Sequence, residues 1–174
     1  MPAPRIEKMA RVLVEYSARI QKGDRVLIES EAAAEPLIRA LYTSILKAGG
    51  HPHLALHLGG QVSMSGVDTV FFEHANDEQL DHVPPFMLQA YTEFESRFRV
   101  HAVPNTKALT RADGPKQARR ARALAPILEA QFTRGARGDF KWVTTLFPTQ
   151  AYAQDAEMSL EDYEDFVFGA CHVR

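Results

Sequence analysis

Hydrophobic positions at helical spacing alternate along this chain with short apolar runs. Residues 4–20 carry apolar side chains three and four apart, with charged side chains mostly opposite, which predicts an amphipathic helix that ends before Gly23. The apolar, partly β-branched run over 25–29 predicts a buried strand. Helical spacing returns over 33–48 and stops at Gly49-Gly50.

Residues 51–58 alternate strictly, which predicts a second strand. Leucines occupy one face of this strand, and His51, His53, Ala55 and His57 occupy the other. A strand, a helix and a second strand within about 35 residues form a βαβ unit, which belongs to a parallel sheet.

The stretch 61–94 predicts several short helices. Ser65 and Asn76 have the character of N-caps, and Gln79 stands at the capping-box position after Asn76. Pro84-Pro85 is expected to open the last of these helices.

The second half of the chain continues the alternation of strands and helices. Its expected elements are a strand at 97–103 near a sheet edge, a helix from Asp113 to about Arg134 interrupted at Pro126, a strand at 139–147, and two helices capped by Thr149 and Ser159. The whole order predicts an α/β fold, with a mostly parallel sheet of about four or more strands and helices on both faces.

Composition narrows the possible classes of protein. A chain of 174 residues with 45% hydrophobic and 24% charged residues is sized and composed as one globular domain. The net charge of −2 gives no general attraction to nucleic acid or to anionic membranes. Cys171 is the only cysteine, no apolar run is long enough to span a bilayer, and the first residues lack a secretory signal. We therefore expect a cytoplasmic protein.

Three groups of residues could suggest a metal site. The His51, His53 and His57 row would need a further ligand such as Glu29, and we interpret it as an ordinary polar strand face. The two histidines within 74–82 lack the spacing of a zinc helix, so a solvated surface is the better interpretation. The acidic cluster in 161–165 is interpreted as the solvent face of a helix. No metal ligand is expected in this chain.

The sequence gives little support for nucleic-acid binding, phosphate binding or nucleophilic catalysis. The cations Arg111, Lys116, Arg119, Arg120 and Arg122 are not interleaved with aromatic residues, so we expect a solvated helix face or a domain contact rather than a nucleic-acid site. Neither a phosphate-binding glycine loop nor a nucleophile elbow follows any predicted strand. We expect no catalytic residue within the chain.

One positional argument yields candidate cleft residues. Ligands of open parallel sheets bind beyond the carboxyl ends of the strands. The polar or aromatic residues at or near those ends are Asn105, Thr106, Trp142, Thr145 and Phe147. They suit a substrate-cleft wall; the alternative, which is the more common situation, is that Asn105 and Thr149 merely cap turns and helices.

Several stretches together resemble the thermophilic metalloaminopeptidases of the aminopeptidase T and aminopeptidase S type. These stretches are Gly23–Ile28, Ala34–Leu37, Ala48–Pro52, Ala75–Leu80, Pro104–Leu109, Trp142–Thr149, Ala153-Gln154 and Met158–Val167. The resemblance covers essentially the whole chain. It implies a hydrolase that removes N-terminal amino acids from peptides with two divalent metal ions (zinc, cobalt or manganese), and that forms homodimers.

The same resemblance implies which part of such an enzyme this chain is. The family's metal ligands lie in a C-terminal part that begins after the point where this sequence ends, so none is carried onto a residue here. Residues 1–174 are therefore expected to be the N-terminal α/β domain of a larger two-domain aminopeptidase, inactive without its catalytic domain.

The last helix fits this expectation. Its apolar stripe over 160–170 runs to the end of the chain without a glycine cap, and without a partner it would expose Phe166 and Val167. Two other functions remain open: a non-enzymatic dimerisation or partner-binding module, and a small-molecule-binding α/β domain with a metal on its histidine face.

Overall fold

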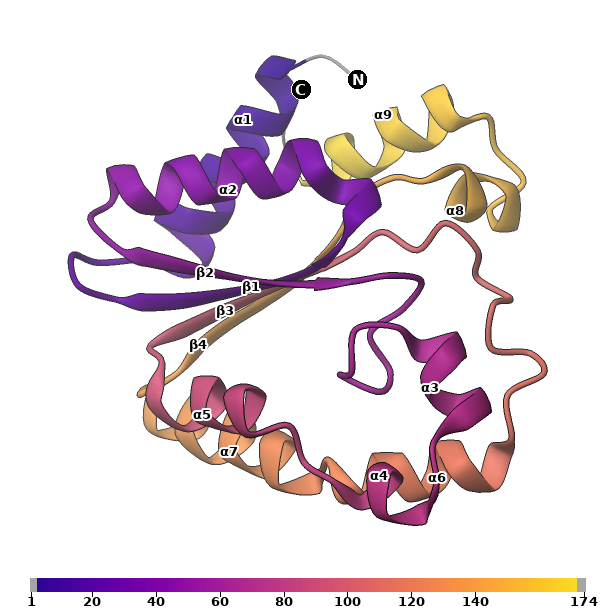
Figure 1. Cartoon of the computed structure of the whole chain (residues 1–174). Helices are drawn as coiled ribbons and strands as arrows, with labels where there is room; N and C mark the ends of the chain where they lie inside the picture. Colours follow the sequence, from indigo (N-terminus) through magenta and orange to yellow (C-terminus); the bar gives the residue numbers. More distant parts are fainter. Residues whose placement is uncertain (1–2, 172–174) are drawn as a thin grey trace.

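The computed structural model describes residues 3–171, with one four-stranded sheet at its centre (Figure 1). The strands are β1 (Arg25–Glu31), β2 (His51–His57), β3 (Ser96–His101) and β4 (Lys141–Leu146). They lie in the order β2-β1-β3-β4, and all three pairings are parallel. The predicted α/β fold and its parallel βαβ unit are thus confirmed.

The strand order creates a switch point between β1 and β3. From β1 the chain passes to β2 on one side and then crosses to β3 on the other. The connections on the two sides of β1 therefore diverge, and crevices that bind ligands form at such points beyond the carboxyl ends of the strands.

Helices cover both faces of the sheet, as predicted (Figure 1). One layer holds α1 (Ala3–Arg11), which continues as a π-helical turn over Val12–Ser17, α2 (Glu35–Lys47), preceded by a 3₁₀ turn over Ala32–Ala34, and α9 (Leu160–Ala170). The other layer holds α5 (Pro85–Glu93) and α7 (Ala125–Arg137), with α3 (Asp68–His74), α4 (Asp77–Asp81) and α6 (Gly114–Ala123) beyond the carboxyl ends of the strands. Helix α8 (Gln150–Asp155) follows β4.

The two faces of the sheet differ in chemistry. The face beneath α1 and α2 is apolar, with Val26, Ile28, Phe98 and Val100 all fully buried. The opposite face begins with apolar residues such as Leu27 at the amino ends of the strands, where α5 and α7 pack. Towards the carboxyl ends it becomes ionic. Burial of apolar surface stabilises the first face, whereas the second requires paired polar groups.

Most of the helix starts predicted from capping residues and prolines are confirmed by the structure. Asn76 and Gln79 form the predicted capping box, and Pro85 opens α5. The side chains of Asp113, Thr149 and Ser159 cap α6, α8 and α9. The long helix restarts near Pro126, as α6 and α7, as predicted.

One local expectation was wrong. Val67, not Ser65, precedes α3, because the Ser65 hydroxyl is engaged with Ser63 instead. Strand β3 lies near an edge as expected, next to the edge strand β4, but it is an inner strand between β1 and β4, and its Phe98 and Val100 are buried. Its alternating charged residues resemble an exposed strand, but they face a buried ionic cluster.

Candidate functional site at the strand ends

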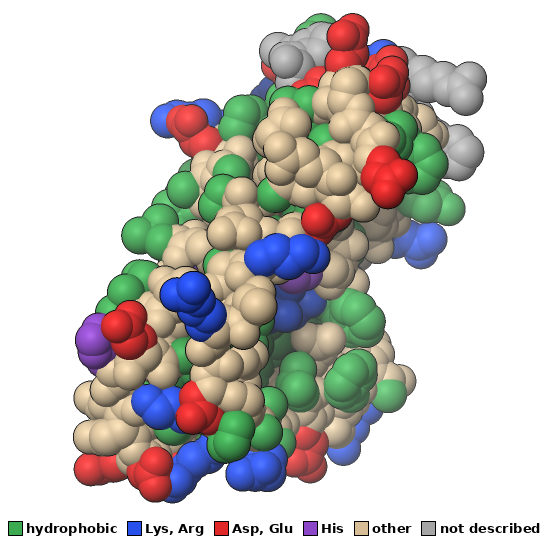
Figure 2. Space-filling view, turned by 90° about the vertical axis from the view of Figure 1, so that its right-hand side faces the viewer, with side chains coloured by type: hydrophobic (Ala, Val, Ile, Leu, Met, Phe, Trp, Pro, Cys, Tyr) green, Lys and Arg blue, Asp and Glu red, His purple; other side chains and the backbone are tan. Residues whose placement is uncertain are grey.

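A cavity of about 400 Å³ lies at the carboxyl ends of β1 and β3, at the switch point of the sheet. Figure 2 shows the face of the molecule on this side, hollowed near its middle where basic and histidine side chains meet hydrophobic ones. The position is the one at which parallel α/β sheets bind their ligands.

Both polar and apolar side chains line this strand-end cavity. The polar residues are Glu31, Gln61, Arg99, His101, Asn105 and Thr106. The apolar residues are Val62, Met64, Val103, Ala108, Leu109, Ala121, Leu124 and Leu128. A mainly apolar wall with a small number of polar groups that point into the cavity is typical of a small-molecule site.

Parallel register places the charged residues of the ionic face side by side. Glu29 pairs with Arg99 across β1 and β3, and Glu31 pairs with His57 across β1 and β2. Residues in register on neighbouring parallel strands point to the same face of a sheet, so these side chains all face the helices α5 and α7 and the cavity beyond them.

A network around Glu29 forms the floor of this region. Glu29 is fully buried and accepts a hydrogen bond of 2.6 Å from the Tyr91 hydroxyl. Arg99 donates to the other carboxylate oxygen at 3.2 Å, and an Arg97 nitrogen lies 3.6 Å from Glu29 Oε2. Burial, together with the Glu29 charge, raises the pKa of Tyr91 to about 12, so its hydroxyl keeps its proton as a donor. Two guanidinium groups therefore face one carboxylate, which leaves one positive charge in excess in this network.

Glu31 is held differently. It is 1% exposed, and its Oε2 accepts from the Ala102 backbone N–H at 2.7 Å and from Gln61 Nε2 at 2.8 Å. Its Oε1 has no hydrogen-bond partner, and none of the ion pairs among residues 3–171 includes Glu31. The Oε1 of Gln61 is also unpartnered, and its orientation is fixed because Nε2 donates to Val100 O as well. Two buried oxygen acceptors are thus unsatisfied at the cavity wall.

Two histidines border the same region. His57 is 2% exposed, and neither ring nitrogen has a hydrogen-bond partner. Burial lowers its pKa, against the opposing effect of the nearby carboxylates. Burial and the charge of Arg99 lower the pKa of His101, which lines the cavity. Both imidazoles are therefore favoured in their neutral form.

The loop that closes one side of the cavity is held by two buried charges. Asp68 accepts hydrogen bonds from the backbone N–H groups of Val62 and Ser63 at 2.7 and 2.9 Å. Arg120, 1% exposed, donates to the carbonyl oxygens of Ser63 and Leu80 at 2.8 and 3.1 Å, and also to that of His82. The basic segment that includes α6 was expected to be solvated or to make a domain contact. Arg120 is instead buried, and its hydrogen bonds link the loop at Ser63 to α4 and the residue after it.

Of the five cleft residues proposed from the sequence, two line the strand-end cavity and three lie elsewhere. Asn105 and Thr106 lie in the cavity wall, and the Asn105 side-chain oxygen accepts from the Lys107 backbone N–H at 2.9 Å. Trp142 lies near the amino end of β4, where its ring meets that of Phe132 edge-on at 6.3 Å. Phe147 is buried in the apolar core beneath α1 and α2, and Thr145 lies in β4 outside the cavity.

The residues that sequence reasoning did not select are Glu31, Gln61, Arg99 and His101. A signal for Glu31 was present, because it is a charged residue at the carboxyl end of a mainly apolar strand. Arg99 and His101 end the next buried strand of the sheet. Gln61 carried no signal, because its loop has no periodic pattern.

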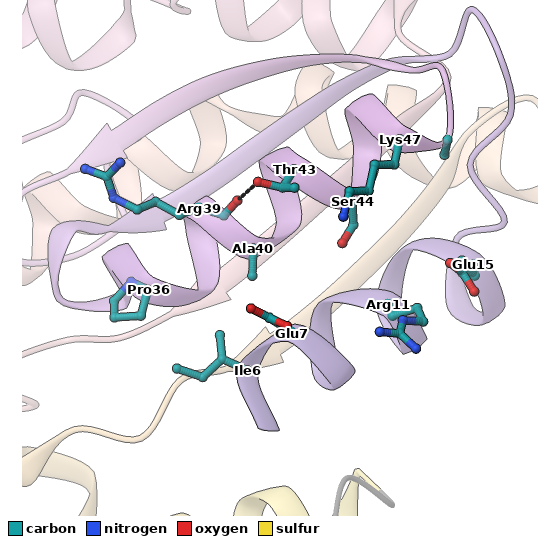
Figure 3. Close-up of a pocket in the computed structure, with 11 residues that line it drawn as sticks. Ile6, Glu7, Arg11, Glu15, Pro36, Arg39, Ala40, Thr43, Ser44 and Lys47 are labelled. Atoms are coloured by element: carbon teal, nitrogen blue, oxygen red, sulfur yellow. Dashed lines mark hydrogen bonds between the residues drawn. The ribbon is translucent and has the colours of Figure 1, made fainter. Parts of the chain in front are cut away.

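A second, larger hollow lies between α1 and α2 (Figure 3). Its volume is about 540 Å³, and it is bordered by charged side chains such as Glu7, Arg11 and Arg39. The Arg39 side chain is 78% exposed and pairs with Glu35 one turn away. Because no unsatisfied buried polar atom lines this groove among the described residues, it is a weaker candidate than the strand-end cavity.

The other clusters noted in the sequence serve local structure. Arg119 pairs with Asp77 and Asp81, which ties α6 to α4. Asp165 of the acidic cluster pairs with Arg5 of α1. His51 and His53 are exposed, unlike the buried His57. Within residues 3–171, no three His, Cys, Asp or Glu side chains are gathered as a metal site would require.

The fold and the strand-end cavity define this chain as a parallel α/β domain, and comparison with known proteins gives its family. Residues 3–174 match the family described as thermophilic metalloprotease (M29), and the chain belongs to this family. Among described helices, none combines the length and hydropathy needed to cross a membrane.

Two relatives are similar over most of this chain. Aminopeptidase 2 of Geobacillus stearothermophilus is 25% identical over 164 residues, which are 91% of this chain and 38% of that protein. The solved structure of wild-type AmpT from Thermus thermophilus has the same fold, with a TM-score of 0.69 and 21% identity over 96% of this chain and 42% of that chain. The chain thus spans about two fifths of the length of these relatives.

Proposed function

We propose that this chain is the N-terminal α/β domain of a larger aminopeptidase, which releases N-terminal amino acids from peptides. The observation that carries the proposal is the match of residues 3–174 to a metalloprotease family, together with a curated relative that is an aminopeptidase. In this assignment the domain supports and partly encloses the substrate chamber, and peptide is the substrate of the whole enzyme.

The hydrolytic metal ions would be bound outside this chain. Two divalent ions, zinc, cobalt or manganese, would activate water and polarise the scissile carbonyl in the whole enzyme. Residues 3–171 do not fit such a centre, because they gather no three-residue ligand group. The residues described here would therefore bind and orient substrate or partner segments and exclude water, and they take no part in the metal-dependent step. The whole enzyme is proposed to be cytoplasmic.

The direct test is an assay of purified chain 1–174 with L-leucine p-nitroanilide and added Co²⁺, Zn²⁺ or Mn²⁺. We expect no turnover and less than one bound metal ion per chain after dialysis. Turnover that co-purifies with the chain would refute the assignment of the metal ions to other polypeptide. A chimera in which this chain replaces the matched segment of the Geobacillus enzyme should release leucine from the same substrate.

A second candidate function is a dimerisation or partner-binding module without catalysis. Exposed apolar side chains favour it: Leu54 and Leu56 on the edge strand β2 are 45% and 47% exposed, and Phe166 on α9 is 64% exposed. The homodimer implied by the family resemblance would use such surfaces. A stable monomer of the chain in light scattering across a wide concentration range would count against this function, whereas an active chimera would favour the aminopeptidase.

A further inference from the structure

Arg99 presents an unused part of its guanidinium group to the strand-end cavity. Its Nη2 donates to Glu29 Oε1 at 3.2 Å and to the Tyr91 hydroxyl at 3.3 Å. Its Nη1 donates no hydrogen bond within residues 3–171, and unlike its Nε it is not closed off from solvent. The Arg99 side chain is 17% exposed and lines the cavity. A ligand in the cavity therefore meets a charged donor that has no partner.

The carboxylates nearby leave this donor available. Arg97 and Arg99 share the single carboxylate of Glu29, so one positive charge of this network is in excess. The other carboxylate of the cavity wall belongs to Glu31, which is 1% exposed. Its Oε2 is engaged by two N–H donors of the protein, and its Oε1 is closed off from solvent. The charged group that this wall presents to the cavity is thus a guanidinium group and not a carboxylate.

Backbone N–H groups on two loops of the cavity also lack acceptors. One loop is 59–61, which follows β2, and the other contains Asn105 and Thr106, which follow β3. Within the described part of the chain, none of these five N–H groups donates a hydrogen bond. Gly60 and Gln61 are buried, and a buried N–H group requires an acceptor. Consecutive free N–H groups in a turn are a common means of binding an anion.

The unsatisfied donors and the apolar wall together define the ligand. Only an acceptor satisfies N–H donors, and a carboxylate pairs with a guanidinium group through charge-assisted hydrogen bonds. A single negative charge matches the one excess positive charge, whereas a second would lie near the buried Glu31 without a further cation. The apolar wall includes Met64, Val103, Leu124 and Leu128, and the volume of about 400 Å³ accommodates a body of several carbons.

We propose that the strand-end cavity binds a short aliphatic monocarboxylate, with Arg99 Nη1 as its charged donor and the backbone N–H groups of the 59–61 loop as further donors. The ligand carries no ammonium group beside its carboxylate. Such a group would meet the Arg99 charge, and the acceptors Glu31 Oε1 and Gln61 Oε1 are closed off from it. The inference does not depend on the proposed function, since it rests on the cavity of this chain alone.

The test is a chemical-shift titration of ¹⁵N-labelled chain 1–174 at neutral pH with 4-methylpentanoate. The amide 4-methylpentanamide is the uncharged ligand of the same shape. We expect saturable shifts of the backbone amides in 59–61 and at the carboxyl end of β3 with the carboxylate, and binding at least about tenfold weaker with the amide. Equal binding of the two ligands, no saturable shift, or shifts confined to other residues would overturn the proposal.

Two competitors test the class of ligand. L-Leucine has the carbon skeleton of 4-methylpentanoate with an ammonium group beside the carboxylate, and inorganic phosphate is an anion without an apolar body. We expect each to displace 4-methylpentanoate only at concentrations at least about tenfold higher than 4-methylpentanoate itself requires. Equal competition by leucine would make the cavity an amino-acid site, and equal competition by phosphate would make it a general anion site. Either result would contradict the proposed class.

A charge-removing variant tests the role of Arg99. Arg99→Gln should weaken binding of 4-methylpentanoate at least about tenfold. The matched control is Arg137→Gln, which removes the same charge from an exposed position in the last turn of α7, shortly before the amino end of β4 and therefore at the opposite end of the strands. It should bind as the unaltered chain does. Equal affinity of the two variants would refute the assignment of Arg99.

A second variant tests the location if Arg99→Gln does not fold. Leu128 is 41% exposed at the cavity wall, so Leu128→Trp should block entry without disturbing the core, and binding should be lost. Leu46→Trp, on α2 at 54% exposure, is its matched control and should leave binding unchanged. Undiminished binding in Leu128→Trp would show that the carboxylate is bound elsewhere.

Discussion

The Tyr91 hydroxyl donates a hydrogen bond of 2.6 Å to Glu29 Oε2, and it accepts one of 2.6 Å from Arg97. Sixty-two residues separate Tyr91 from Glu29 in the sequence. One phenol thus connects α5 to two neighbouring strands, because it is hydrogen-bonded to both a buried carboxylate and a buried guanidinium group.

Removing this hydroxyl should destabilise the domain. In Tyr91→Phe, Glu29 loses its closest donor and Arg97 loses an acceptor, and each unsatisfied buried group costs about 1–3 kcal/mol. We expect the free energy of unfolding, measured by urea denaturation, to fall by about 2 kcal/mol or more. Tyr16→Phe, at a side chain 74% exposed, is the matched control and should leave it unchanged. Equal stability of the two variants would show that the network contributes nothing.

Replacing His57 should reduce the loss of stability in acid. Because burial lowers the folded-state pKa of His57 below its ordinary value of 6.5, the unfolded chain takes up the proton first as pH falls. The stabilising contribution of the neutral imidazole is complete above pH 6.5 and is lost as pH falls from there towards the folded-state pKa.

The variant His57→Leu removes both this proton and the two unpartnered ring nitrogens. Relative to the unaltered chain, its free energy of unfolding should gain up to about 1 kcal/mol more at pH 5.5 than at pH 7.5. Urea denaturation at the two pH values measures the difference. His74→Gln, at an exposed side chain, is the control substitution. A parallel pH dependence in His57→Leu and the unaltered chain would contradict the argument.

Arg120 should be the most sensitive of the basic residues in α6. Arg120→Met leaves the carbonyl oxygens of Ser63, Leu80 and His82 without their donor, and should lower the free energy of unfolding by about 2–4 kcal/mol. Thermal unfolding compares it with Arg122→Met, an exposed position on the same helix that should change little. If both variants unfold alike, Arg120 does not hold the loop.

Gly60 allows the backbone to approach Asp68. Its φ is +147°, and a Cβ there would lie 2.7 Å from Asp68 Oδ2. Gly60→Ala should therefore displace the carboxylate from the N–H groups of Val62 and Ser63, and lower the free energy of unfolding by about 1–3 kcal/mol. The control is Gly114→Ala, where a Cβ meets nothing within 4 Å, and which should not lower the free energy of unfolding in the same denaturation experiment.

The sequence predicted individual helices and strands better than it predicted which elements lie next to one another in the fold. Helix caps at Asn76 and Ser159 depend on residues three apart, so their signals are local and the structure has both. The place of β3 between β1 and β4 depends on a crossover that no local pattern encodes, and its charged residues indicated only a position near an edge.

The candidate site shows the same division. The argument from strand ends led to Asn105 and Thr106, which do line the cavity. It could not separate them from Phe147, which follows β4 but turns into the core, nor find Gln61, which reaches Glu31 across 30 residues. Whether these residues contact substrate stays a prediction.

The chemical contrast between the two faces of the sheet determines which amino-acid substitutions each face tolerates. Beneath α1 and α2, one aliphatic side chain can replace another of similar volume at modest cost, because dispersion contacts are interchangeable. Around Glu29 and Arg97 each group satisfies a specific neighbour, so an acceptable exchange must alter several positions together. Random mutagenesis with selection for folding should therefore yield single substitutions on the first face and coupled sets on the second.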